Sequence, residues 1–353
     1  MAKSSSLLGI DLAYVIATIG CITGAVLFNV GGRMHLLSHE HYYLIMDFFP
    51  ALFFFLNGFT VTLTMRDRRV SSRKLLSYMG RRGSVLMIIG VLFIKIWPVN
   101  LFFASGLFFL ISPFFAQWNN LILRSFLVFI WVISVVFINF DFPTFTTFSG
   151  LQLGGADFKH LFSFLLFNGY LSPLPWAFFF VAGLIYGRTD FRPRGWLPPS
   201  SLIAIIVILS SIAIEKYAVS IYGAKDRDVL LNAWGFNLKF YLPAFLIYGI
   251  ALCYLIMNTL IYVLRGYTAG AFSNFVNNVS ASKYSIYFFA MFIGIITKSS
   301  TNDIIFRERW AIMLFAVGIV IISIWMSFFW KRKVSKKTPI EWMIKKMSSS
   351  SSK

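Results

Sequence analysis

Three of the four histidines in the chain lie within seven residues, at His35, His39 and His41, with Glu40 between the last two. An exposed imidazole has a pKa of about 6.5, so it can act as a general base near neutral pH. The alternative is that these are ordinary polar residues of a loop, and the residues alone leave both interpretations open. A metal site is not expected, because no convincing fourth ligand accompanies the three histidines.

Polar side chains also interrupt the apolar runs on either side of these histidines. Asp47 lies six residues after His41, Asn57 lies ten residues further along, and Asp11 lies in the first apolar run. Ionisable groups at membrane depth are costly and usually face a bundle interior or a wet cavity. Asp47 is placed to orient a histidine ring, whereas Asp11 has the alternative of capping a helix.

A strongly basic stretch over 66–82, expected to be a loop, follows the apolar run that begins after the histidines. Its cations are Arg66, Arg68, Arg69, Arg73, Lys74, Arg81 and Arg82, and Arg188 follows a later apolar run. Guanidinium forks match the oxygen pairs of phosphate groups, which indicates an anion-binding surface. The alternative is that the charge sets membrane orientation and contacts anionic lipid headgroups.

The elements that must hold these residues are predicted to be membrane helices. Of the 353 residues 58% are apolar and the mean hydropathy is +0.75, against about 45–50% apolar residues in a soluble domain. A spanning helix needs about 20 apolar residues. The sequence therefore predicts an all-α integral membrane protein, a polytopic bundle of about ten transmembrane helices, with a single domain over 1–346 and a disordered tail over 347–353. The expected spans are 7–31, 42–65, 83–98, 100–116, 121–140, 173–187, 200–220, 236–264, 284–298 and 310–330.

Charge predicts the orientation of this bundle. The net charge is +19, and Lys and Arg concentrate in cytoplasmic loops of membrane proteins. Ten spans put both termini on one side, together with the basic stretch 66–82 and a C-terminal cluster, so the termini are predicted to be cytoplasmic. The histidine loop 32–41 is then extracytoplasmic. A polar linker is expected over 265–282, and no nucleic-acid partner is expected.

Several short segments resemble a known group of membrane enzymes. FPALFFFLNGFTVTL (49–63) resembles the second span of the heparan-glucosaminide N-acetyltransferase-like membrane proteins and of the related acyltransferase 3 proteins. GIDLAYVIATIGC (9–21) is similar to their first span. FNGYLSPLPWAFFFVAGLIYGRTDFR (167–192), SKYSIYFFAMF (282–292) and TPIEW (338–342) resemble later segments, and the five matches fall in the family order.

This resemblance implies a transmembrane acyltransferase of the cell membrane. Such a protein takes an acyl group, commonly acetyl, from cytoplasmic acyl-CoA and delivers it to an extracytoplasmic acceptor such as a sugar or glycan. A histidine of the first external loop is the catalytic residue that the resemblance implies, so the candidates are His35, His39 and His41, with Asp47 holding the imidazole. The phosphates of acyl-CoA would lie near the basic stretch 66–82.

The same resemblance suggests a path for the donor. The pantetheine arm would pass Asn57 and Trp176, and Arg188 would join the phosphate-binding cations; no metal is expected, for the reason given above for the histidines. The chain departs from the family pattern at Tyr14 and Val15, which replace Arg-Gly, and at Phe289 and Phe292, which replace Tyr and His. A transporter or lipid flippase and a catalytically inactive family member therefore remain alternatives, and a homo-oligomer is left open.

Overall fold

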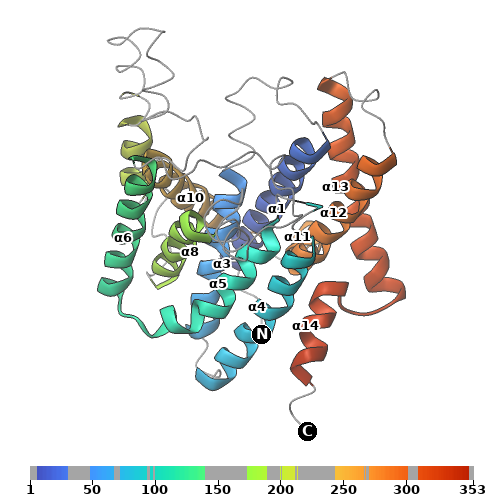
Figure 1. Cartoon of the computed structure of the whole chain (residues 1–353), viewed down its shortest axis with the longest axis horizontal. Coiled ribbons are helices and arrows are strands. Elements are labelled where there is room, and N and C mark those ends of the chain that lie inside the picture. The colour runs from blue at the N-terminus through green and yellow to red at the C-terminus, as the bar shows by residue number, and fades with distance from the viewer. Residues whose placement is uncertain are drawn as a thin grey trace, which may run out of the picture. The chain divides into compact units, whose positions relative to one another are not determined.

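A computed structural model describes the chain over residues 6–30, 48–66, 72–93, 96–97, 100–139, 173–188, 199, 201–210, 213, 243–265, 267, 270–300 and 309–349. Every regular element in these ranges is a helix (Figure 1), so the predicted all-α class is confirmed. The helices are α1 (Ser6–Val30), α3 (Phe49–Arg66), α4 (Ser72–Phe93), α5 (Leu101–Gln117), α6 (Asn120–Asn139), α8 (Pro173–Arg188), α10 (Pro243–Val263), α11 (Ala271–Ala281), α12 (Lys283–Ser300), α13 (Arg309–Lys333) and α14 (Pro339–Ser349).

Four of the described helices are long and apolar enough to cross a membrane. They contain the segments Leu8–Leu27, Leu75–Phe93, Phe245–Val263 and Met313–Lys333. A fifth span is formed if α11 and α12, which are bent by 69° at their junction, are counted together. The predicted count of about ten spans is not confirmed for the described residues. The shorter apolar helical stretches are Leu101–Phe115, Asn120–Ile133, Trp176–Arg188 and Ser201–Ser210 within the described residues. At 1.5 Å per residue the longest of these stretches would rise about 23 Å, less than a hydrocarbon core of about 30 Å.

The chain divides into two compact units. Unit 1 comprises Met1–Leu56, Asp190–Ile205 and Ala251–Lys353, and unit 2 comprises Asn57–Thr189 and Ile206–Ile250. Each unit gathers segments from distant parts of the sequence, and each is described by itself. The single domain over 1–346 stays a prediction. Residues 347–349, which begin the tail expected to be disordered, form the end of α14.

Helix α4 begins inside the basic stretch that was expected to be a loop over 66–82. The helix starts at Ser72, eleven residues before the expected span, so this part of the prediction is wrong. Arg, Lys, Leu and Met are all good helix formers, and Leu75 and Met79 are buried one turn apart. An apolar stripe therefore continues through the basic residues, and its burial stabilises this part of the chain as a helix.

The expected polar linker over 265–282 also contains a helix, α11. Its buried residues are Val276, Val279 and Ser280, which share one face at a spacing of three and four residues. Polar residues lie between them, so the composition of the segment predicts a linker although its buried residues share one helix face. The prediction of a linker is therefore wrong for 271–281.

Close backbone packing shapes the centre of unit 2. Helices α4 and α5 are antiparallel neighbours, because Gly83 meets Gly106 while Gly90 meets Phe103. A Cβ added to Gly106 would come within 2.5 Å of the backbone nitrogen of Met87. Only glycine permits this approach at that point. The turn is fixed by Asn100, whose Oδ1 accepts from the Phe102 amide at 2.9 Å and whose Nδ2 donates to the Gly90 carbonyl at 2.8 Å.

Candidate functional site

The four residues predicted to carry catalysis lie outside the described part of the chain. They are His35, His39, His41 and Asp47, and Arg69 of the predicted phosphate-binding set also lies there. Arg73 and Lys74 belong to the first turn of α4, but only their backbone is described. Geometry is available for the remaining candidates, which lie in unit 2.

Two predicted phosphate-binding arginines hold helix ends of unit 2 together. Arg66, the last residue of α3, donates from Nη1 to the carbonyl of Gly187 on α8 at 3.2 Å. Arg188, the last residue of α8, donates from Nη2 to the Phe115 carbonyl at 3.0 Å and from Nη1 to the Trp118 carbonyl. The last carbonyls of a helix lack intrahelical partners and carry partial negative charge, so cations stabilise them.

Arg81 and Arg82 lie on helix α4, at the end of unit 2 where Arg66 and Arg188 bind the helix carbonyls. The Arg82 guanidinium lies 4.4 Å from the ring centroid of Phe109 on α5, a cation–π contact. Both arginines are half-buried. Because α4 runs antiparallel to α5, its N-terminal half lies beside the C-terminal half of α5, where Arg188 binds. The fold thus brings four cations predicted from the sequence to one end of unit 2, and we call them the arginine cluster: Arg66, Arg81, Arg82 and Arg188.

Asn57 and Trp176, predicted to line a donor channel, are fully buried side chains of unit 2. Asn57 donates from Nδ2 to Ser105 Oγ of α5 at 3.4 Å. The Trp176 ring centroid lies 5.7 Å from that of Phe179 and 6.4 Å from that of Phe245. These contacts place both residues in the packed interior, and their role beside a bound donor stays a prediction.

A polar cluster in unit 1 was not predicted as a site. Ser280, at the end of α11, donates to Asp11 Oδ1 of α1 at 2.7 Å. Lys283, the first residue of α12, is only 8% exposed, and its Nζ lies 3.7 Å from the ring centroid of Tyr14. Tyr14 is the residue that replaces the arginine of the family pattern, so a cation from another helix contacts the side chain at that position.

Two lysines stabilise the bend between α11 and α12. Lys331 Nζ, from α13, donates to the Asn278 carbonyl at 3.1 Å. Lys283 Nζ lies 3.5 Å from the Ser280 carbonyl. Both cations thus face the C-terminal carbonyls of α11, which is the negative end of that helix. The bend is therefore held by interactions from three helices of unit 1.

Helix α14 is joined to α12 through its first turn. Ser285 donates to Glu341 Oε2 and accepts a 3.0 Å hydrogen bond from the Ile340 amide, so a side chain of α12 caps α14. Thr338, which precedes the helix, also donates to Glu341 Oε2. The sequence carried a signal for this helix start, since Thr-Pro-Ile-Glu fits the capping-box pattern with proline at the first helical position.

The segments that carried the family resemblance meet within the two units. In unit 1, residues of 9–21 lie against the start of α12, and 282–292 binds 338–342 through Ser285 and Glu341. In unit 2, Thr62 donates to the Leu184 carbonyl at 3.0 Å, which joins 49–63 to 167–192. Of the two late-span departures, Phe289 is buried and Phe292 is 48% exposed.

Comparisons of the chain with protein-family models, with curated proteins and with solved structures gave no match. Within the described ranges, no group of three His, Cys, Asp or Glu side chains is placed to hold a metal ion. In unit 2 the candidate site rests on the arginine cluster with Asn57 and Trp176, and unit 1 separately holds the polar cluster of Asp11, Ser280 and Lys283.

Proposed function

We propose that the protein is a transmembrane acyltransferase. It moves an acyl group, which we propose is acetyl, from cytoplasmic acyl-CoA to an extracytoplasmic acceptor such as a sugar. The observation that carries this proposal is the meeting of the resembling segments. In unit 1, the segment 9–21 contacts the segment 282–292 through Tyr14 and Lys283. The segment 282–292 in turn contacts 338–342 through Ser285 and Glu341.

The arginine cluster supplies a place for the charged part of the donor. Acyl-CoA is anionic through its phosphates, and arginine recognises phosphate through charge-assisted, often bidentate hydrogen bonds. In this proposal Arg81 and Arg82 bind the phosphates, and Arg66 and Arg188 hold the neighbouring helix ends in place. The first turn of α4 adds two more cations to the sequence of the same helix, Arg73 and Lys74.

The proposed chemistry uses one of His35, His39 and His41 as general base. The imidazole takes the proton of an acceptor hydroxyl, the acceptor oxygen bonds to the thioester carbon, and the carbon–sulfur bond breaks. The CoA thiolate then takes up a proton as it leaves. Asp47 would orient the ring and stabilise the imidazolium. Prior acylation of the histidine is the alternative order of the same steps.

A second candidate function is transport, favoured by the bend of 69° between α11 and α12. Discontinuous helices with polar residues at the break form the substrate and ion sites of many transporters. The buried Lys283 and the Asp11–Ser280 pair lie at this break. This candidate needs no acyl donor, which separates it from the first.

The test is turnover of labelled acetyl-CoA by the purified, reconstituted protein. CoA release and transfer of label to protein or glycan are measured for wild type, His35→Ala, His39→Ala and His41→Ala. One of these variants is expected to lose roughly 10²–10⁴-fold in kcat, as for removal of a general base. His160→Ala is the matched control, because it removes the histidine outside the group of three.

A parallel measurement addresses the donor site. Arg81→Gln is expected to raise the KM for acetyl-CoA, whereas Arg124→Gln, which removes an exposed cation of α6 outside the arginine cluster, leaves it unchanged. Absence of acetyl-CoA binding together with absence of turnover on any acceptor would overturn the acyltransferase proposal. Uptake of a solute by proteoliposomes without acetyl-CoA would favour transport.

A further inference from the structure

The end of the chain carries dense positive charge directly beyond a candidate membrane span. The segment Met313–Lys333 is one of those able to cross a membrane. Residues 331–346 contain one acidic residue, Glu341, and the cations Lys331, Arg332, Lys333, Lys336, Lys337, Lys345 and Lys346. Such a surplus of cations beside a span is attracted to anionic headgroups.

Helix α14 presents two different faces. Ile340 and Ile344, one turn apart, are 1% and 8% exposed, and α14 packs on α12. Trp342 and Met343 are 42% and 40% exposed. Lys346 Nζ lies 4.9 Å from the centroid of the Trp342 ring, so a cation and an aromatic ring share the outer face. This is the composition of a helix at a membrane–water interface.

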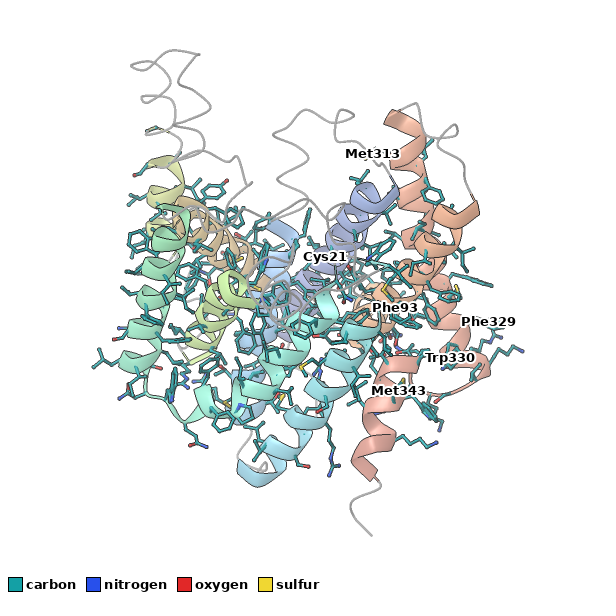
Figure 2. The ribbon with its side chains drawn as sticks, in the orientation of Figure 1. Cys21, Phe93, Met313, Phe329, Trp330 and Met343 are labelled. Atoms are coloured by element: carbon teal, nitrogen blue, oxygen red, sulfur yellow. The ribbon has the colours of Figure 1, made fainter. Side chains whose placement is uncertain are left out.

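The attachment of α14 places this face close to the end of the span. Ser285 and Glu341 bind its first turn to the start of α12. Lys331, two residues before the end of α13, binds the neighbouring end of α11 at Asn278. Trp342 and Met343 directly follow Glu341, so they lie within one helical turn of the residues that bind α14 to α12. Figure 2 labels Phe329 and Trp330 near the end of α13 and Met343 on α14.

We propose that this outer face binds the anionic phospholipid headgroups of the leaflet at which α13 ends. On α14 the lipid-binding face consists of Trp342, Met343 and Lys346. We include in it the exposed cations that precede α14 in the chain, which are Arg332, Lys333, Lys336 and Lys337. The aromatic and thioether side chains lie at headgroup depth and the cations bind phosphate. Each cation near such a surface contributes roughly a fivefold preference for anionic lipid. The proposal is independent of any acyltransferase activity.

The test uses full-length protein in nanodiscs of phosphatidylcholine, alone or mixed with phosphatidylglycerol. Met343→Cys is labelled with an environment-sensitive fluorophore; Cys21 and Cys253 are buried, and labelled wild type gives the background. Emission is expected to move to shorter wavelength, with stronger quenching by headgroup nitroxides, when phosphatidylglycerol is present. Equal emission in the two membranes would overturn the proposal.

A matched pair of variants separates this face from general charge. Lys336→Gln with Lys337→Gln is expected to reduce the response, whereas Arg124→Gln with Arg265→Gln, which also removes two exposed cations, preserves it. Native mass spectrometry of unlabelled wild type and both variants counts the phosphatidylglycerol molecules that each protein retains. If the proposal holds, Lys336→Gln with Lys337→Gln retains fewer than wild type, and Arg124→Gln with Arg265→Gln retains as many. Equal retention in all three proteins contradicts it. A fluorescence shift caused by short RNA in phosphatidylcholine discs, without any shift from phosphatidylglycerol, would identify a nucleic-acid surface instead.

Discussion

Asp11 in α1 accepts a 2.7 Å hydrogen bond from Ser280 at the end of α11, although the two residues are 269 positions apart. The bond joins the first helix of the chain to the bend between α11 and α12. The donor side chain, Ser280, is only 4% exposed, so this bond satisfies a buried hydroxyl. It therefore connects the first span to the bend through side chains.

Ser280→Ala is expected to lower the stability of the protein by about 0.5–1.5 kcal/mol, the usual net contribution of one hydrogen bond. Thermal unfolding followed by tryptophan fluorescence gives the change in Tm. Ser273→Ala, on the same helix, is the control and should leave Tm nearly unchanged. Equal Tm values for the two variants would remove the stabilising role of this pair.

Gly58 is expected to tolerate no side chain. A Cβ added there would lie 1.9 Å from the carbonyl oxygen of Phe180, so α3 and α8 would have to separate. Gly58→Ala should cost about 1–3 kcal/mol, the range for overpacking a core. Gly318→Ala is the matched control, because its Cβ would meet nothing within 4 Å, and alanine in an open helix position adds stability. Thermal unfolding should therefore move in opposite directions for the two variants.

The cap from α12 to α14 gives a third prediction. Ser285→Ala removes the acceptor of the Ile340 amide and a donor to Glu341, and loss of a cap costs about 0.5–2 kcal/mol. Hydrogen exchange of the α14 amides should accelerate, while exchange in α4 and α5 stays the same. Ser335→Ala serves as the control, since Ser335 precedes the helix and accepts only a weak 3.3 Å bond from the Lys337 amide. Protection of α14 unchanged in Ser285→Ala would contradict the cap.

Arg188→Lys separates structure from donor binding. Lysine keeps the positive charge but lacks the fork that reaches the Phe115 and Trp118 carbonyls and Asn120 Oδ1. Tm is expected to fall, because at least one carbonyl at the end of α5 loses its donor, while the KM for acetyl-CoA stays within about twofold. A large rise in KM with unchanged Tm would instead assign Arg188 to the phosphates.

The apolar runs were sufficient to predict helices but not their number of crossings. Runs such as 100–116 and 173–187 are apolar throughout, and they do form α5 and α8, yet each is short for a span. Helix propensity and hydrophobicity are local properties, so they give the elements. Whether a short helix crosses a bilayer depends on its packing and on the local thickness of the lipid.

The candidate site was predictable only in part for the same reason. The arginine cluster could be anticipated, because four cations at the ends of neighbouring apolar runs must lie near one end of a bundle. The contacts of Lys283 with Tyr14 and of Ser285 with Glu341 could not be, since they need the bend after Ala281. Neither proline nor glycine marks that bend, which is held by lysines from α12 and α13.

The contact between α4 and α5 depends on three positions that carry no side chain. Gly83, Gly90 and Gly106 each lie against backbone atoms of the opposite helix, so a methyl group at any of them would push the two backbones apart. The separation of this helix pair is therefore set by main-chain contact, and the side chains around it can be exchanged more freely than these three glycines.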